Sequence, residues 1–271
     1  MIRRLLITAL IALVAAGGAL AVFGLPLADI RPEGVSLADD PVAEAEGRRL
    51  LARMLQSHGG ADALHRHHTL DLDLRDTWVG LGTLFNPWPA DDQRVHLTLR
   101  VHTFDSEVRF VDGPREGQVW GIRDFATYRR EGDRQDPIAD ADLRFMLPTT
   151  HYFVEMPQRL TEAEIVRSVG RERVGDREYD LVYATWGTVD ANRAYDQYRI
   201  YLDPETGRLA KVWYTVREIG SFVEGVGHFD DLREVDGFLV AHRVAVTPGI
   251  GDDPATDALH TMVFDGFTFD R

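Results

Sequence analysis

The sequence predicts a mainly β fold of the α+β class, built on a large curved antiparallel sheet with a few short helices. Between residues 165 and 269, short segments rich in Val, Tyr, Phe, Trp and Thr follow one another, and these residue types suit a half-buried pleated surface. Turn signals at 174–176, 188–192, 203–207 and 235–237 separate the segments. Because no ten-residue helical pattern lies between them, we expect a meander of antiparallel strands and not βαβ units.

An uncharged stretch, residues 5–27, follows Arg3 and Arg4 and predicts a membrane segment. A helix needs about 20 apolar residues to cross a bilayer core. Two interpretations fit: a transmembrane helix that anchors the chain in the inner membrane, or a signal peptide cut after Ala21. Apolar residues continue past Ala21 to Leu27 and favour the anchor. By the positive-inside rule, both place the remaining chain on the periplasmic, extracytoplasmic side of the cell envelope.

These patterns divide the chain into three parts: residues 1–29 as the membrane anchor or signal peptide, 30–39 as a linker and 40–271 as a single β-rich domain. The chain has no cysteine, which excludes disulfides, thiolate metal sites and a cysteine nucleophile. The formal net charge is −14, and an acidic surface repels phosphate backbones. We therefore expect no nucleic-acid partner.

The first element of the predicted domain is a helix that begins at Asp40 and ends at Gly59 and Gly60. Asp40 suits the N-cap, Pro41 suits the first helical position, and a glycine suits the end. A short helical turn is expected over 61–67. Apolar residues recur with helical spacing between these limits, so one face of the helix is expected to be buried.

Strands are expected next, over 70–75, 95–101, 108–111 and 118–128. The first two alternate strictly between apolar and polar residues, which predicts strands with one face in water. The pattern changes over 136–164, where apolar residues recur with helical spacing and prolines interrupt them. This region predicts one or two short helices that form a lid over one face of the sheet.

About six further strands complete the expected domain. Several of them are apolar on both faces, so both faces must be at least partly sheltered. Their expected bounds are 165–174, 179–186, 194–202, 209–216, 225–232 with 238–246, and 260–269.

This order of elements resembles the periplasmic lipoprotein carrier superfamily, the LolA/LolB-like proteins. The resemblance covers residues 41–271 and includes the helix that ends in His58-Gly59-Gly60 and the segment 195–209, which looks like the paired strands and tight turn common there. It implies an unclosed β-barrel wrapped around helices, with an apolar cavity that holds acyl chains or another lipophilic ligand. Two features depart from the family: the segment favoured as an anchor, which a soluble shuttle would lose, and the absence of the lipid-modified cysteine of the membrane-bound receptor.

Aromatic and other apolar residues are the candidates for the lining of such a cavity or for its lid. Apolar walls with few polar groups are typical of small-molecule sites, whereas plain core packing is the alternative for each residue taken alone. The predicted ligand-binding residues are Leu143, Phe145, Met146, Tyr152, Phe153, Met156, Trp186, Trp213 and Tyr214.

Catalytic and metal sites have little support in the sequence. The serines lie in no nucleophile motif, and no glycine-rich phosphate loop is present, so we expect neither catalytic residues nor a cofactor. The histidines at 58, 65, 67 and 68 fit either a metal site or a polar helix end, and the second interpretation is favoured, so no metal is expected.

The function expected from these observations is non-enzymatic binding of a lipid or lipoprotein in an apolar cavity under a helical lid. The alternative is an envelope interaction or sensor domain on the same fold, which would bind the tail or strand of a partner protein at a sheet edge. An envelope hydrolase is the third and least supported interpretation.

Overall fold

The structure is a computed structural model and describes residues 26–36 and 38–270. Apart from Pro26 and Leu27, the predicted membrane segment lies outside the described residues. Among the residues described, no helix is both long enough and apolar enough to cross a bilayer.

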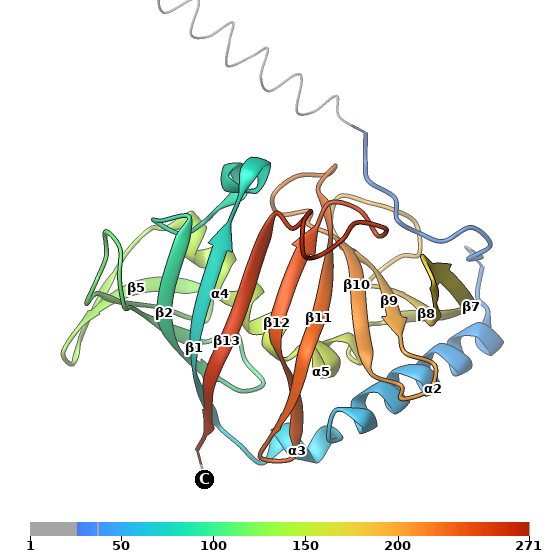
Figure 1. The fold of residues 1–271 in the computed structure, drawn as a ribbon, viewed down its shortest axis with the longest axis horizontal. Coiled ribbons are helices and arrows are strands. Elements are labelled where there is room, and N and C mark those ends of the chain that lie inside the picture. Colours follow the sequence, from blue (N-terminus) through green and yellow to red (C-terminus); the bar gives the residue numbers. More distant parts are fainter. Residues whose placement is uncertain (1–25, 37, 271) are drawn as a thin grey trace, which may run out of the picture.

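Thirteen strands in the described part of the chain form one antiparallel sheet that curves strongly but does not close (Figure 1). The strand order is β6-β5-β4-β3-β2-β1-β13-β12-β11-β10-β9-β8-β7, so β6 and β7 are the two edges. The strands are β1 (Thr69–Trp78), β2 (Asp92–Arg100), β3 (Ser106–Phe110), β4 (Val119–Arg123), β5 (Ala126–Glu131), β6 (Arg134–Pro137), β7 (Ile165–Val174), β8 (Arg177–Thr185), β9 (Gln197–Leu202), β10 (Leu209–Thr215), β11 (Glu224–Val235), β12 (Phe238–Thr247) and β13 (His260–Phe269).

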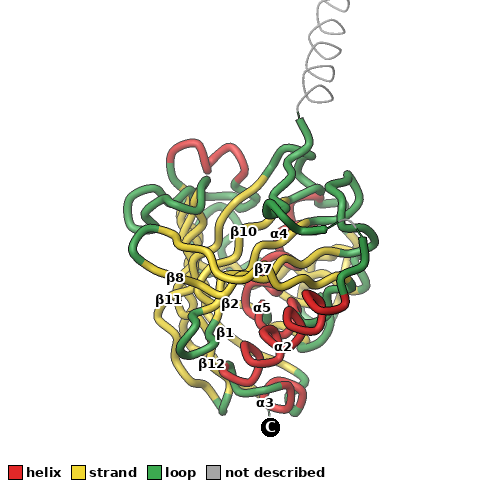
Figure 2. The backbone as a smooth tube through the Cα atoms, turned by 90° about the vertical axis from the view of Figure 1, so that its right-hand side faces the viewer, coloured by secondary structure: helices red, strands yellow, loops and turns green. Residues whose placement is uncertain are grey.

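Short helices accompany the sheet, and α4 and α5 lie within its curve (Figures 1 and 2). A 3₁₀ helix, η1, projects from the opposite end of the sheet to α3 in both views. The helices are α2 (Pro41–Ser57), α3 (Ala61–His65), η1 (Gly80–Phe85), α4 (Ala141–Val154) and α5 (Met156–Leu160). Two helices between two sets of strands confirm the arrangement expected over 136–164.

The start of α2 has the predicted cap. The Asp40 carboxylate accepts a hydrogen bond of 2.9 Å from the Ala43 backbone N–H, and Pro41 is the first helical residue. The helix ends before Gly59, whose φ of +106° lies in the left-handed region that glycine adopts at little cost.

The region predicted as one strand over 118–128 is instead a hairpin of β4 and β5, and β6 after it was not predicted. The turn is made by Asp124 and Phe125, both with positive φ. A two-residue hairpin turn is usually signalled by Asn-Gly or Asp-Gly, and neither occurs here. The Asp124 backbone N–H donates to Asp105 Oδ1 at 2.9 Å, a contact that helps to hold the turn.

The core lies between the concave face of the sheet and α2, α4 and α5. Gly47 lets α2 approach β7 closely. A Cβ atom at this position would lie 2.7 Å from Val166 Cγ1 and 2.9 Å from the Ser168 backbone nitrogen. The absence of a side chain therefore sets the distance between this helix and the sheet.

One end of the curved sheet is closed by the end of α2 and by α3, and we call it the closed end. The buried His58 ring accepts a hydrogen bond from the Leu209 N–H at 3.2 Å, and its Nδ1 lies 2.8 Å from the Leu239 carbonyl oxygen. Burial lowers the pKa of His58, which keeps the ring neutral and Nε2 able to accept. Arg66 also donates to the Asp236 carbonyl at 2.6 Å, so this end is firmly tied.

Candidate functional site

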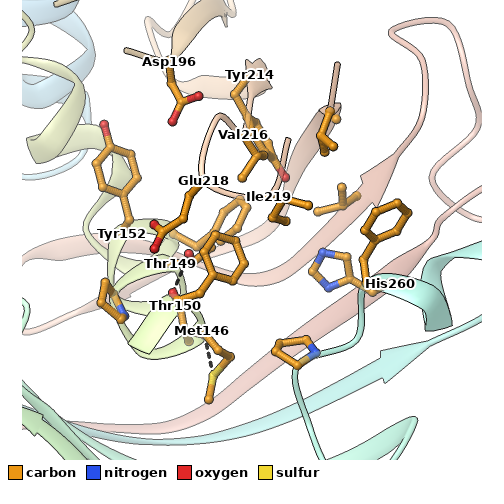
Figure 3. A pocket seen from close by; sticks show the side chains of 18 of the residues that line it. Met146, Thr149, Thr150, Tyr152, Asp196, Tyr214, Val216, Glu218, Ile219 and His260 are labelled. Carbon is orange, nitrogen blue, oxygen red and sulfur yellow. Dashed lines mark hydrogen bonds between the residues drawn. The ribbon is translucent and has the colours of Figure 1, made fainter. Parts of the chain in front are cut away.

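A cavity of about 580 Å³ lies on the concave side of the sheet, at the end opposite the closed end. Figure 3 shows its lining from close by. Its wall includes the last residue of β1, Trp78, the first residue of β13, His260, and residues at the adjoining ends of β10, β11 and β12. Figure 3 shows side chains of α4, such as Met146, on one side and His260 on the other. The volume lies within the range of about 300–1,000 Å³ that small-molecule sites occupy.

Helix α4 supplies one wall of the cavity. Its first turn is capped by Asp140, whose carboxylate accepts from the Leu143 N–H at 2.8 Å. Phe145, Thr149 and Tyr152 line the cavity, and their spacing of four and three residues places them on one face of the helix. The helix therefore presents a mainly apolar strip to the cavity while its other side packs in the core.

Asp76 is a buried carboxylate in the cavity wall, only 4% exposed. Its Oδ2 accepts hydrogen bonds from the indole N–H groups of Trp78 at 3.0 Å and Trp88 at 2.9 Å, and its Oδ1 lies 3.1 Å from His260 Nδ1. The Trp78 and His260 rings stack with centroids 3.9 Å apart. This carboxylate therefore fixes the orientation of an aromatic wall.

A second polar group at the cavity is Asp196, which accepts from Thr215 Oγ1 at 3.0 Å and from the Arg217 backbone N–H at 2.8 Å. Burial raises the pKa of Asp196. Burial likewise raises the pKa of the nearby Tyr198 and Tyr214 phenols, so both stay neutral at physiological pH. This part of the wall therefore places a few polar groups beside an otherwise apolar space.

An ion network fixes the junction of α4 and α5 beside the cavity. Glu155 is buried, with His151 Nε2 at 3.0 Å and Arg159 Nη2 at 2.7 Å. Burial alone would raise the pKa of Glu155, but the His151 hydrogen bond and the Arg159 charge outweigh it and lower the pKa. Arg159 also donates to the Thr103 carbonyl at 2.6 Å and lies over the Phe104 ring. The helix junction is thus tied to a loop that lines the cavity.

No protein-family model and no curated protein matches the sequence. Among solved structures, the chain is similar to a LolA superfamily protein from Nitrosomonas europaea, with a TM-score of 0.50, 9% identity, and coverage of 80% of this chain and 92% of that one. It is similar in the same way to a DUF1329 family protein from Desulfovibrio piger, with a TM-score of 0.50, 9% identity, and coverage of 84% and 93%. The chain has the LolA-like fold. At this identity the likeness concerns the fold alone.

The LolA-like fold brings six of the nine predicted ligand-binding residues to the cavity wall: Phe145, Met146, Tyr152, Phe153, Met156 and Tyr214. Leu143 is buried in the core instead and is not part of the cavity wall. Trp186 is half-buried against Tyr198, with ring centroids 5.6 Å apart, and does not line the cavity.

Trp213 lies on the other face of the sheet from Tyr214, because successive residues of a strand point to opposite faces. It packs with Tyr179 and Leu181, and the Arg199 guanidinium lies 4.7 Å from its ring centroid. Because β10 has apolar residues on both faces, the sequence alone did not show whether Trp213 or Tyr214 faces the cavity.

Among the residues that line the cavity but were not predicted are the large apolar side chains of Phe104, Phe125, Ile219 and Phe222. All four lie in loops or turns, where no periodic pattern exists to show which way a side chain points. The signal that marks them is the presence of large apolar residues in otherwise polar connecting segments.

Two of the histidines considered for a metal site, His58 and His67, make ring hydrogen bonds with different parts of the chain. His58 joins β10 and β12, as described above, while His67 Nδ1 lies 2.7 Å from the Asp270 carbonyl oxygen. Within residues 26–36 and 38–270, no three His, Cys, Asp or Glu side chains form a group that could hold a metal ion.

Proposed function

We propose that the protein is a membrane-anchored, extracytoplasmic lipid-binding protein of the carrier type, which holds a lipophilic ligand in the cavity. The observation that supports this function best is the chemistry of the cavity wall. A space of about 580 Å³ is lined mainly by aromatic and aliphatic side chains, with polar groups confined to a few positions. Burial of an acyl chain is favourable by about 0.8 kcal/mol for each methylene removed from water.

Helix α4 acts as the lid in this proposal. Pro148 lies within the helix and cannot donate the backbone hydrogen bond to residue 144, so the helix bends more easily there. The network around Glu155 holds the other end of the helix to the loop at Thr103. The part of α4 before Pro148 would therefore move, and the ligand would replace Phe145 against the sheet.

Native mass spectrometry of the full chain tests this function directly. The chain is purified from membranes of its own host in mild detergent. A lipid mass that is released on denaturation supports a carrier and gives the class of its cargo. A mass without bound lipid, with no later uptake of a fluorescent fatty acid, would favour the envelope interaction or sensor domain.

Filling the cavity provides the matched test. Thr149 lines the cavity and is half-buried, so Thr149→Trp places a large ring in the space that the ligand needs. We expect about tenfold weaker binding of a fluorescent fatty acid. The ring would keep about two methylenes of the ligand from being buried, which lowers the binding free energy by about 1.6 kcal/mol. The control is Thr188→Trp, at an exposed position outside the cavity wall. Equal binding by both folded variants would argue against the cavity as the binding site.

A further inference from the structure

Large apolar side chains gather around the mouth of the cavity and are exposed to solvent. Their exposed fractions run from 38% to 77%, whereas side chains of these types are usually buried. They lie on η1, on the turn between β4 and β5, and on the loop between β10 and β11. The residues are Leu81, Leu84, Phe85, Phe125, Ile219 and Phe222, and we call them the mouth rim.

The structure holds the rim residues outward. The Val79 N–H before η1 donates to the Leu259 carbonyl at 2.9 Å, and Gly82 packs so closely on that carbonyl that a Cβ atom would lie 2.3 Å from its oxygen. This contact fixes η1 on the loop before β13 while Leu81 and Leu84 point into water. Phe125 has a φ of +60°, a conformation unfavourable for a bulky residue, and its ring is 53% exposed.

The start of the described chain is fastened beside the same rim. The Ala28 N–H donates to the Ser221 carbonyl at 2.8 Å, and Arg217 donates to the carbonyls of both Ala28 and Ser221 at 2.6 Å. Phe222 follows directly in this loop. The uncharged stretch 5–27 therefore joins the domain next to the mouth, and Figure 1 shows η1 and the first described residues at the same end of the sheet.

We propose that the mouth rim inserts into the surface of the bilayer in which residues 5–27 are anchored, so that the cavity opens toward the acyl chains of that bilayer. The inference rests on the anchor in the proposed function but not on occupancy of the cavity. Apolar side chains at such a surface reach about 5–10 Å into the boundary between headgroups and acyl chains. With a formal net charge of −14, docking depends on apolar insertion and not on attraction to anionic headgroups.

The absence of cysteine allows a single probe to be placed at will. The full chain carries Leu84→Cys or, separately, Leu81→Cys, labelled with an environment-sensitive fluorophore. Each protein is reconstituted in phosphatidylcholine nanodiscs that contain lipids with a nitroxide quencher on the acyl chain. The matched control is Val42→Cys on α2, which is 79% exposed and lies outside the rim.

We expect several-fold stronger quenching at residues 81 and 84 than at residue 42, and the difference should persist at high salt. Equally weak quenching at all three positions would overturn the docking proposal. Fatty-acid binding measured in the same nanodiscs separates the two ideas. Binding without rim quenching would remove only the docking, whereas rim quenching without binding would support the docking and count against the carrier function.

Discussion

Asp76 shows how one residue organises the site. Its carboxylate binds side chains from β1, from the loop after η1 and from β13, and His260 is 184 positions away in the sequence. Both Trp78 and Trp88 are large aromatic residues, but no local pattern in the sequence joins them to Asp76. This part of the site could not be predicted, because the contact depends on the pairing of β1 with β13.

We expect Asp76→Ala to lower the free energy of unfolding by about 3 kcal/mol. The loss follows because two buried indole N–H groups would lose a charged acceptor. Asp92→Ala is the control: Asp92 binds Arg75 with two hydrogen bonds of 2.8 and 2.7 Å but lies on the surface, where a pair contributes up to about 1 kcal/mol. Chemical denaturation in mild detergent compares the two, and equal losses would contradict this role of Asp76.

Helix α2 shows how packing can override the preference of a residue. Gly47 lies inside the helix, where alanine is normally better by about 1 kcal/mol. At this position, however, a Cβ atom would lie 2.9 Å from the Ser168 backbone nitrogen. A backbone atom cannot relieve such a clash by changing rotamer. Overpacking of this kind costs about 1–3 kcal/mol.

We therefore expect Gly47→Ala to lower the free energy of unfolding by about 1 kcal/mol, although it raises helix propensity. Val42→Ala on the exposed face of the same helix should leave the stability unchanged or slightly higher. Thermal melting distinguishes the variants. A gain in melting temperature for Gly47→Ala would mean that α2 does not pack on β7 this closely.

The regular elements were predictable to the extent that one face of each is buried. Alternation in β1 and β2 and the capped start of α2 gave elements that the structure confirms. The turn at Asp124 and Phe125 was missed because its residues adopt positive φ without the usual glycine. The short edge strand β6 was missed because it contains only four residues, all polar except proline.

At the scale of the whole molecule, the two ends of the sheet differ in how firmly they are held. The closed end is tied by His58 and Arg66, whereas the mouth is built from loops and η1. The sequence did not predict where the mouth lies. Its position depends on how the sheet curves, and the alternation of apolar and polar residues predicts strands but not curvature.

Hydrogen exchange of the full chain should follow this difference. We expect the backbone amides of Leu209 and Leu239, which bond to His58, to exchange among the slowest, and amides of the loop 217–223 to exchange much faster. A bound fatty acid should slow exchange at the mouth and leave the closed end unchanged. Uniform slowing at both ends would mean that the ligand acts on global stability and not on the mouth.

The pairing of β1 with β13 has a consequence for how the chain folds. In the described sheet, every other pair of neighbouring strands is consecutive along the chain, whereas Leu70 lies opposite Phe269. The two halves of the sheet can each assemble from local hairpins, but their junction must close a very long loop, which is entropically slow. Until the thirteenth strand has been made, β1 has an unpaired edge and a row of uncovered leucines. During biogenesis, this unpaired edge can therefore pair with the strand of another chain until β13 covers it.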